Sequence, residues 1–191
     1  MNEHGHTLLE MVIVVAIILI LASVSIPYLR AYTVEAHALG AGRLFKAEFR
    51  KARGIAAMRK VNTAIRFERQ GDRDYFSVYV DGNLNGVRAD DIASGHDPRV
   101  AGPFPLDGRA QGVSVGINPG VPAIPPETGL LDTRDPIRFG RSNMVSFSPL
   151  GTATPGTFYL AGEGLQAAVR VTGGSARVRL MVWRGTWQER P

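Results

Sequence analysis

The sequence predicts an α+β protein in which one long N-terminal helix precedes a head of antiparallel β-strands. Two patterns carry this prediction. Apolar residues fill positions 8–29 and then recur at helical spacing to about Arg59. From Val61 onward the period changes to two residues, and short stretches of this kind alternate with Gly- and Asn-rich turns. A helix followed by a run of strands is typical of the α+β class.

Composition limits the chemistry that the chain can perform. The 191 residues suffice for one core, and the absence of Cys excludes disulfides, thiolate zinc sites, iron–sulfur clusters and cysteine nucleophiles. The last histidine, His96, precedes Ser114 of the G-x-S-x-G match at 112–116, which excludes the serine-hydrolase order. We therefore expect no enzyme. The formal charge of +5 fits either an anionic partner or a charge spread over the surface.

The first element is the apolar segment Leu8–Leu29, LLEMVIVVAIILILASVSIPYL. As a helix it would extend roughly 33 Å, enough to cross a bilayer. No Lys or Arg precedes the segment and no small-residue cleavage site follows it, which disfavours a signal peptide. Glu10 inside an apolar helix indicates a functional carboxylate. We expect a transmembrane helix that the protein retains.

The residues Gly5-His6-Thr7-Leu8-Leu9-Glu10 resemble the processing site of type IV prepilins and type II secretion pseudopilins. The resemblance implies that prepilin peptidase removes a leader, 1–5, and that His6 becomes the N-methylated first residue. It also assigns Thr7, Glu10 and Pro27 to the assembly segment, 6–29, where the Glu10 carboxylate would meet the amine of a neighbouring subunit. His6 stands where the family usually has Phe, and the leader lacks the usual basic residues.

An amphipathic helix is expected over 30–60, continuing into the head past a kink at Pro27. Gly40, Gly42 and Gly54 favour a further bend. The apolar stripe of this helix consists of Tyr28, Tyr32, Leu39, Phe45, Phe49, Ala52 and Ala56.

The remaining residues, 61–191, are expected to form the β-rich head. A hairpin is predicted across the turn at Gln70–Asp72, and residues 90–136 are predicted to be long loops with one strand at Val113–Ile117. The other predicted strands are Ile137–Phe139, Met144–Phe147, Thr157–Leu160, and a last hairpin of Ala168–Thr172 with Arg177–Trp183.

The run from Val145 to Leu160 and the Gly173-Gly174 hairpin are similar to the GspH/FimT-like pseudopilins. The resemblance implies a minor pilin or pseudopilin, a structural subunit of a type II secretion pseudopilus or a type IV pilus, in its tip or initiation complex. It implies a single-pass protein of the inner membrane whose periplasmic head is an antiparallel, sandwich-like pilin head. The partners would be other pilins, the assembly platform and prepilin peptidase.

The loop Asp81-Gly-Asn83-Leu-Asn85-Gly86 carries the D-x-N-x-N-G core of an EF-hand-type calcium loop, followed by Asp90 and Asp91. Position twelve is Ile92 and not Glu, so the bidentate ligand is missing. A calcium ion and a plain polar turn are therefore both open interpretations. No other cofactor is expected.

Arg177, Arg179 and Arg184 lie near two tryptophans at the C-terminal end. Some FimT-like minor pilins act in DNA uptake through arginines in this region. Arg177 and Arg179 are predicted to alternate on one strand and to project from the same face. Phosphate contacts with aromatic stacking would suit nucleic acid, and a solvated edge hairpin is the alternative that we favour.

Overall fold

The computed structural model describes residues 7–106 and 112–191, without the side chains of residues 24 and 26–31. Two helices and ten strands are assigned in this part of the chain. They are α1 (Leu8–Arg59), β1 (Thr63–Gln70), β2 (Arg73–Val80), α2 (Ala89–Ser94), β3 (Arg99–Pro105), β4 (Val113–Val115), β5 (Ile137–Arg138), β6 (Met144–Phe147), β7 (Gly156–Gly162), β8 (Leu165–Val171), β9 (Val178–Trp183) and β10 (Trp187–Arg190). The α+β class is confirmed.

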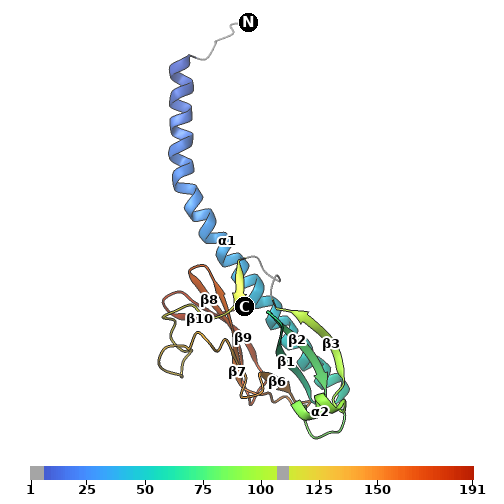
Figure 1. Ribbon diagram of the computed structural model, residues 1–191. Coiled ribbons are helices and arrows are strands. Elements are labelled where there is room, and N and C mark those ends of the chain that lie inside the picture. Colours follow the sequence, from blue (N-terminus) through green and yellow to red (C-terminus); the bar gives the residue numbers. More distant parts are fainter. Residues whose placement is uncertain (1–6, 107–111) are drawn as a thin grey trace.

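Helix α1 is one continuous element of 52 residues. It passes through Pro27 without ending, as predicted. A proline inside a helix removes one backbone hydrogen bond and bends the axis, and the remaining hydrogen bonds continue the helix on both sides. Figure 1 shows the first part of α1 standing clear of the head and the second part lying against it at a changed angle. The helix ends at Arg59, where Lys60 adopts the left-handed conformation with φ 59°.

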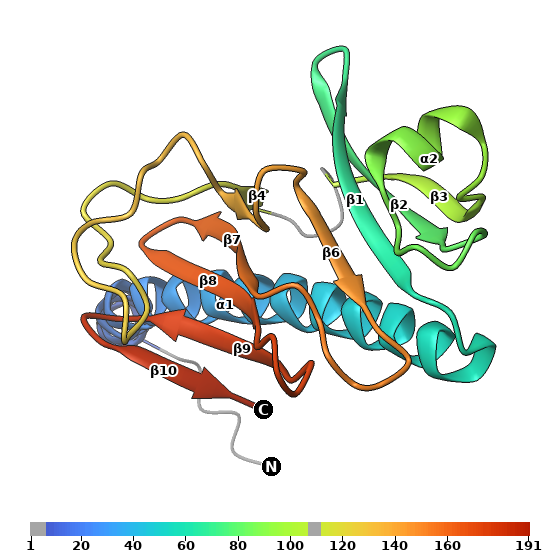
Figure 2. The ribbon, with the colours of Figure 1, turned by 90° about the horizontal axis from the view of Figure 1, so that it is seen from below.

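Two antiparallel sheets pack against the second part of α1 (Figure 2). The four-stranded sheet has the order β3-β2-β1-β6, and the six-stranded sheet has the order β10-β9-β8-β7-β4 with β5 paired to β7. Helix α1 contacts strands of both sheets, chiefly β8, β9, β7 and β1. The head is therefore organised around the helix, and the sheets cover different sides of it.

Phenylalanines fill the space between α1 and the sheets. Phe45 lies with its ring centroid 4.6 Å from that of Phe158, and Phe67 stacks on Phe158 at 5.2 Å. The predicted stripe of α1 is confirmed for Phe45, Phe49, Ala52 and Ala56, all of which are buried. It is wrong for Tyr32, which is 70% exposed, because the head covers the helix only from about Ala38 onward.

The prediction of long loops over 90–136 is wrong in its first part. Residues 89–94 form the short helix α2, and 99–105 form the edge strand β3. Strand β3 contains two prolines and a glycine, a composition that edge strands tolerate and that hides the two-residue period. The last strand, β10, was also not predicted, because its sequence Trp-Gln-Glu-Arg is mostly polar.

The second part of that region, residues 116–136, forms a strap over the outer face of the six-stranded sheet. Ile117, Val121, Ile124 and Leu131 of the strap make a small core with Tyr159 and Ala168 of the sheet. Buried Gln166 receives a 2.7 Å hydrogen bond from the Asn118 backbone N–H and donates to the Gly116 carbonyl. The strap thus covers the part of this outer face around Tyr159 and Ala168.

Candidate functional site

The N-terminal motif residues Thr7 and Glu10 form the start of α1. Thr7 is the N-cap, and its Oγ1 accepts a 3.3 Å hydrogen bond from the Glu10 backbone N–H. A threonine cap followed three residues later by glutamate satisfies an orphan N–H and places a negative charge at the positive end of the helix dipole. The same two residues therefore belong to the processing motif and begin the helix. The predicted cleavage residues, Gly5 and His6, lie outside the described residues.

The first part of α1 presents apolar side chains to its surroundings. Leu8 is 83% exposed, and each large apolar residue from Leu8 to Leu21 is at least 46% exposed. A contiguous exposed apolar surface of this length marks a site that another molecule covers.

Over the residues that the structure describes, no helix combines the length and the apolar character that crossing a membrane requires. The transmembrane segment predicted over 6–29 is therefore not confirmed. Pro27 lies within α1, but its side chain is outside the description.

The predicted calcium loop is organised around a buried carboxylate. Asp81 is 3% exposed, and its Oδ1 accepts a 2.7 Å hydrogen bond from the Leu84 backbone N–H. Its Oδ2 accepts hydrogen bonds from the Gly86 N–H at 2.8 Å and the Asn62 side-chain amide at 2.9 Å. Burial alone would raise the pKa of Asp81, but these hydrogen bonds to the charged form outweigh burial and lower that pKa below its usual value.

The side chains of the other predicted ligands have different surroundings. The Asn83 side-chain oxygen accepts from the Asn85 backbone N–H at 3.3 Å, whereas Asp90 and Asp91 occupy the first turn of α2. A second buried carboxylate, Asp97, accepts from the backbone N–H groups of Gly82 and Arg88. In the described residues, no group of three or more His, Cys, Asp or Glu side chains is arranged to hold a metal ion.

Asp97 was missed by sequence reasoning. It lies 16 residues beyond Asp81, and only the fold brings it back to the same loop. The loop thus has two carboxylates, and both bond to its own backbone.

The three arginines that were predicted to contact nucleic acid lie at two separate places in the head. Arg177 and Arg179 share one carboxylate, because Glu189 lies 3.0 Å from the former and 3.8 Å from the latter. They project from one face as predicted, although Arg177 precedes β9 and is not part of it. Arg184, on the β9–β10 turn, instead pairs with Glu35 of α1.

A row of arginines crosses the outer face of the six-stranded sheet. The strand register pairs Arg138 with Thr157, Thr157 with Arg170, and Arg170 with Arg179. Directly opposed residues of antiparallel strands point to the same face, so these three arginines project together. Arg138 was missed by sequence reasoning, because it lies on a two-residue strand whose partner the sequence alone does not reveal.

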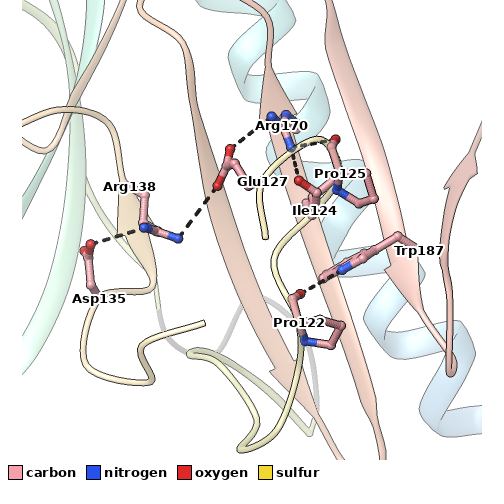
Figure 3. A network of polar contacts seen from close by, with 8 residues as sticks. All are labelled: Pro122, Ile124, Pro125, Glu127, Asp135, Arg138, Arg170 and Trp187. Atoms are coloured by element: carbon pink, nitrogen blue, oxygen red, sulfur yellow. Dashed lines mark hydrogen bonds and ion pairs between the residues drawn. The ribbon is translucent and has the colours of Figure 1, made fainter. Parts of the chain in front are cut away.

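Two carboxylates of the strap form ion pairs with arginines of this row (Figure 3). Glu127 lies 3.0 Å from Arg170 and 4.0 Å from Arg138, and Asp135 lies 3.6 Å from Arg138. Arg170 also donates to the Ile124 carbonyl at 3.1 Å. Trp187 donates to the Pro122 carbonyl at 2.9 Å. The row is therefore held by acidic partners and fixes the strap to the sheet.

The fold and the N-terminal segment together define a class of protein: a β-rich head from which a capped, apolar helix projects. Residues 1–26 of the 191 match the family model described as the prokaryotic N-terminal methylation motif. This match supports the type IV pilin and pseudopilin family, as the sequence resemblance predicted, and leaves the GspH/FimT-like subtype unconfirmed. No curated protein and no solved structure matches the chain.

Proposed function

We propose that the protein is a structural subunit, not an enzyme, of a type II secretion pseudopilus or a type IV pilus, and that it acts as a minor subunit near the tip or in the initiation complex. The observation that carries this proposal is the first part of α1. It begins at a Thr7–Glu10 cap inside a methylation motif and presents apolar side chains that the head leaves uncovered. Side-by-side packing with the same segments of other pilins would bury this surface.

In this proposal the apolar segment has two successive environments. It first anchors the protein at the inner membrane, with the head in the periplasm, and prepilin peptidase cuts after Gly5. The new N-terminus at His6 is then methylated. During assembly on the inner-membrane platform the segment moves into the filament, where the Glu10 carboxylate meets the amine of a neighbouring subunit. A carboxylate in an apolar bundle requires such a charged or hydrogen-bonding partner.

Co-expression with an active prepilin peptidase tests the processing step. Intact-mass measurement should show a chain that has lost residues 1–5 and gained one methyl group, and Gly5→Ala should stay uncut. A major pilin cleaved in the same cells serves as the positive control. An uncut wild-type chain beside a cleaved control would refute the proposal.

The assembly step has its own test. Glu10→Ala should still be cleaved and membrane-associated, but it should be absent from sheared filaments or pseudopili. Glu163→Ala, which changes an exposed acid in the β7–β8 turn, is the matched control and should assemble normally. Equal assembly of both variants would contradict the role of Glu10.

A second candidate function is DNA uptake through the head. The arginine row of Arg138, Arg170 and Arg179 favours it, because guanidinium groups on neighbouring strands could follow a phosphate backbone. The carboxylates that accompany this row weaken the case, since Glu127 and Glu189 already pair with its members. We therefore rank this function below the filament role.

A further inference from the structure

A groove of about 410 Å³ runs between α1 and the end of β10, and basic side chains surround it. Arg43, Lys46 and Arg50 line it from α1, together with Ala47, and Pro191 closes the other side. The three cations lie three and four residues apart, which places them on one face of the helix. The groove belongs neither to the apolar first part of α1 nor to the arginine row on the outer face of the sheet.

Lys46 is the unusual member of this set. It is 8% exposed, and it makes no hydrogen bond or ion pair with any residue that the structure describes. Burial, followed by the nearby positive charge of Arg50, lowers the pKa of Lys46. The stem of Lys46 is packed into the head while its ammonium group opens toward the groove, and no described side chain lies within ion-pair distance of that group.

Within the described part of the chain, Glu189 is the carboxylate that favours the charged form of Lys46 and raises its pKa, and the charge of Glu189 is already shared. Glu189 contacts both Arg177 and Arg179, whereas Arg43 and Arg177 add to the repulsion that Lys46 experiences. Among the side chains that the structure describes, three cations line the groove and no carboxylate lines it with them.

A second unsatisfied group lies at the same edge of the head. The Nε of Arg190 is buried and has no hydrogen-bond partner within the described part of the chain. Arg190 pairs across the strands with Leu180, and Leu180 packs against α1 at Gly42, one residue before Arg43. Arg190 therefore belongs to the strand that borders the groove, and it directly precedes Pro191.

We propose that the groove between α1 and β10 binds a multiply charged oxyanion of the phosphate class, with Lys46 as its central ligand and Arg43 and Arg50 at its sides. The anion could be free or part of a phosphodiester chain. Such an ion would supply the counter-charge that Lys46 lacks and could bond to several cations at once. This inference does not depend on the filament role.

The test uses the full-length chain in detergent and measures the melting temperature in inorganic phosphate against chloride of equal ionic strength. Phosphate should raise the melting temperature of the wild type. Lys46→Met should melt no lower than the wild type in chloride, because it removes a buried, repelled charge. The same variant should bind phosphate at least tenfold more weakly by calorimetry.

Lys51→Met is the matched control, because it makes the same substitution on the exposed side of α1. It should respond to phosphate like the wild type. Equal responses to phosphate and chloride in the wild type, or equal losses in both variants, would overturn the proposal.

A labelled single-stranded oligonucleotide separates the two sources of phosphate. Binding of inorganic phosphate without the oligonucleotide supports a free anion, whereas Lys46-dependent binding of the oligonucleotide supports a phosphodiester. Binding of the oligonucleotide that is unchanged in Lys46→Met, together with no response to phosphate, counts against the groove and points to the arginine row.

Discussion

Gly42 of α1 lies directly against Leu180 of β9. A Cβ at Gly42 would overlap the Leu180 side chain, which is fully buried and has little room to move. Gly40, two residues earlier, is exposed, and a Cβ there would meet no atom within 4 Å. The two glycines thus have different roles, and only Gly42 permits the close approach of helix and sheet.

Alanine substitutions at these two glycines should have opposite effects on stability. Gly40→Ala should stabilise the head by about 0.5–1 kcal/mol, because it lowers the entropy of the unfolded chain and improves helix propensity. Gly42→Ala gains the same propensity but overpacks Leu180, an effect that typically costs about 1–3 kcal/mol. Urea unfolding of the two variants checks this, and a Gly42→Ala protein as stable as Gly40→Ala would contradict the packing argument.

The comparison of these glycines also shows how far the sequence could predict the fold. Helical spacing correctly predicted the buried positions Phe45 and Phe49, because the local period reflects which side of a helix meets the core. The same reasoning assigned Gly42 only a bend, since the contact with Leu180 joins residues that lie far apart in the chain. A local sequence pattern predicts which face of a helix is buried, but it does not predict which residue from elsewhere in the chain packs against that face.

The candidate sites show the same difference between local features, which the sequence predicts, and long-range contacts, which it does not. The assignment of Thr7 and Glu10 to the assembly segment rests on a local motif and stays a prediction, whereas the helix cap that they form comes from the structure. The row of Arg138, Arg170 and Arg179 was not predicted, because it depends on the register of four strands. The loops predicted over 116–136 are confirmed, since no helix or strand is assigned there. Their packing over the sheet was not predicted, because their apolar residues follow neither a helical nor a strand period.

Asp81 should stabilise the head at neutral pH and lose that effect in acid. Its folded-state pKa is lowered, so the stabilisation is present above the unfolded pKa of about 3.9 and is lost as the pH falls through the folded pKa. Asp81→Ala leaves the Leu84 and Gly86 N–H groups without their acceptor and should cost about 1–3 kcal/mol at pH 7.

Urea unfolding is measured at pH 7 and at about pH 3, which lies below the pKa of Asp81 in the unfolded chain. The difference between wild type and Asp81→Ala should shrink in acid. Asp72→Ala, in the exposed β1–β2 turn, is the control and should change stability little at either pH. A difference that stays constant with pH would show that the carboxylate charge is not what matters.

Calcium should leave the melting temperature of the wild type unchanged. Both Asp81 oxygens already accept hydrogen bonds from the loop, and Asn83 bonds to Asn85. A bound ion would displace these bonds. If calcium did bind, a hundredfold excess over its dissociation constant would add about 2.7 kcal/mol of stability, which a melting curve in millimolar calcium would reveal. A rise that disappears in Asn83→Ala would restore the calcium interpretation.

Replacing Arg177 and Arg179 with Gln distinguishes a filament subunit from a DNA receptor. The double variant should fold normally, because it loses only partly exposed ion pairs to Glu189, and such pairs contribute little. Arg66→Gln with Arg69→Gln is the matched control. It removes the same charge and two similar pairs, to Glu68 and Asp74, from the other sheet.

Fluorescence anisotropy of a labelled oligonucleotide at low and physiological salt gives the readout. For a filament subunit we expect weak binding that both double variants reduce equally, because only net charge matters in that case. A DNA receptor would bind with micromolar affinity and a steep salt dependence, and only the Arg177/Arg179 variant would lose part of the salt slope. That second outcome would reverse our ranking, because it would show that the Glu189-paired arginines release their carboxylate to a phosphate.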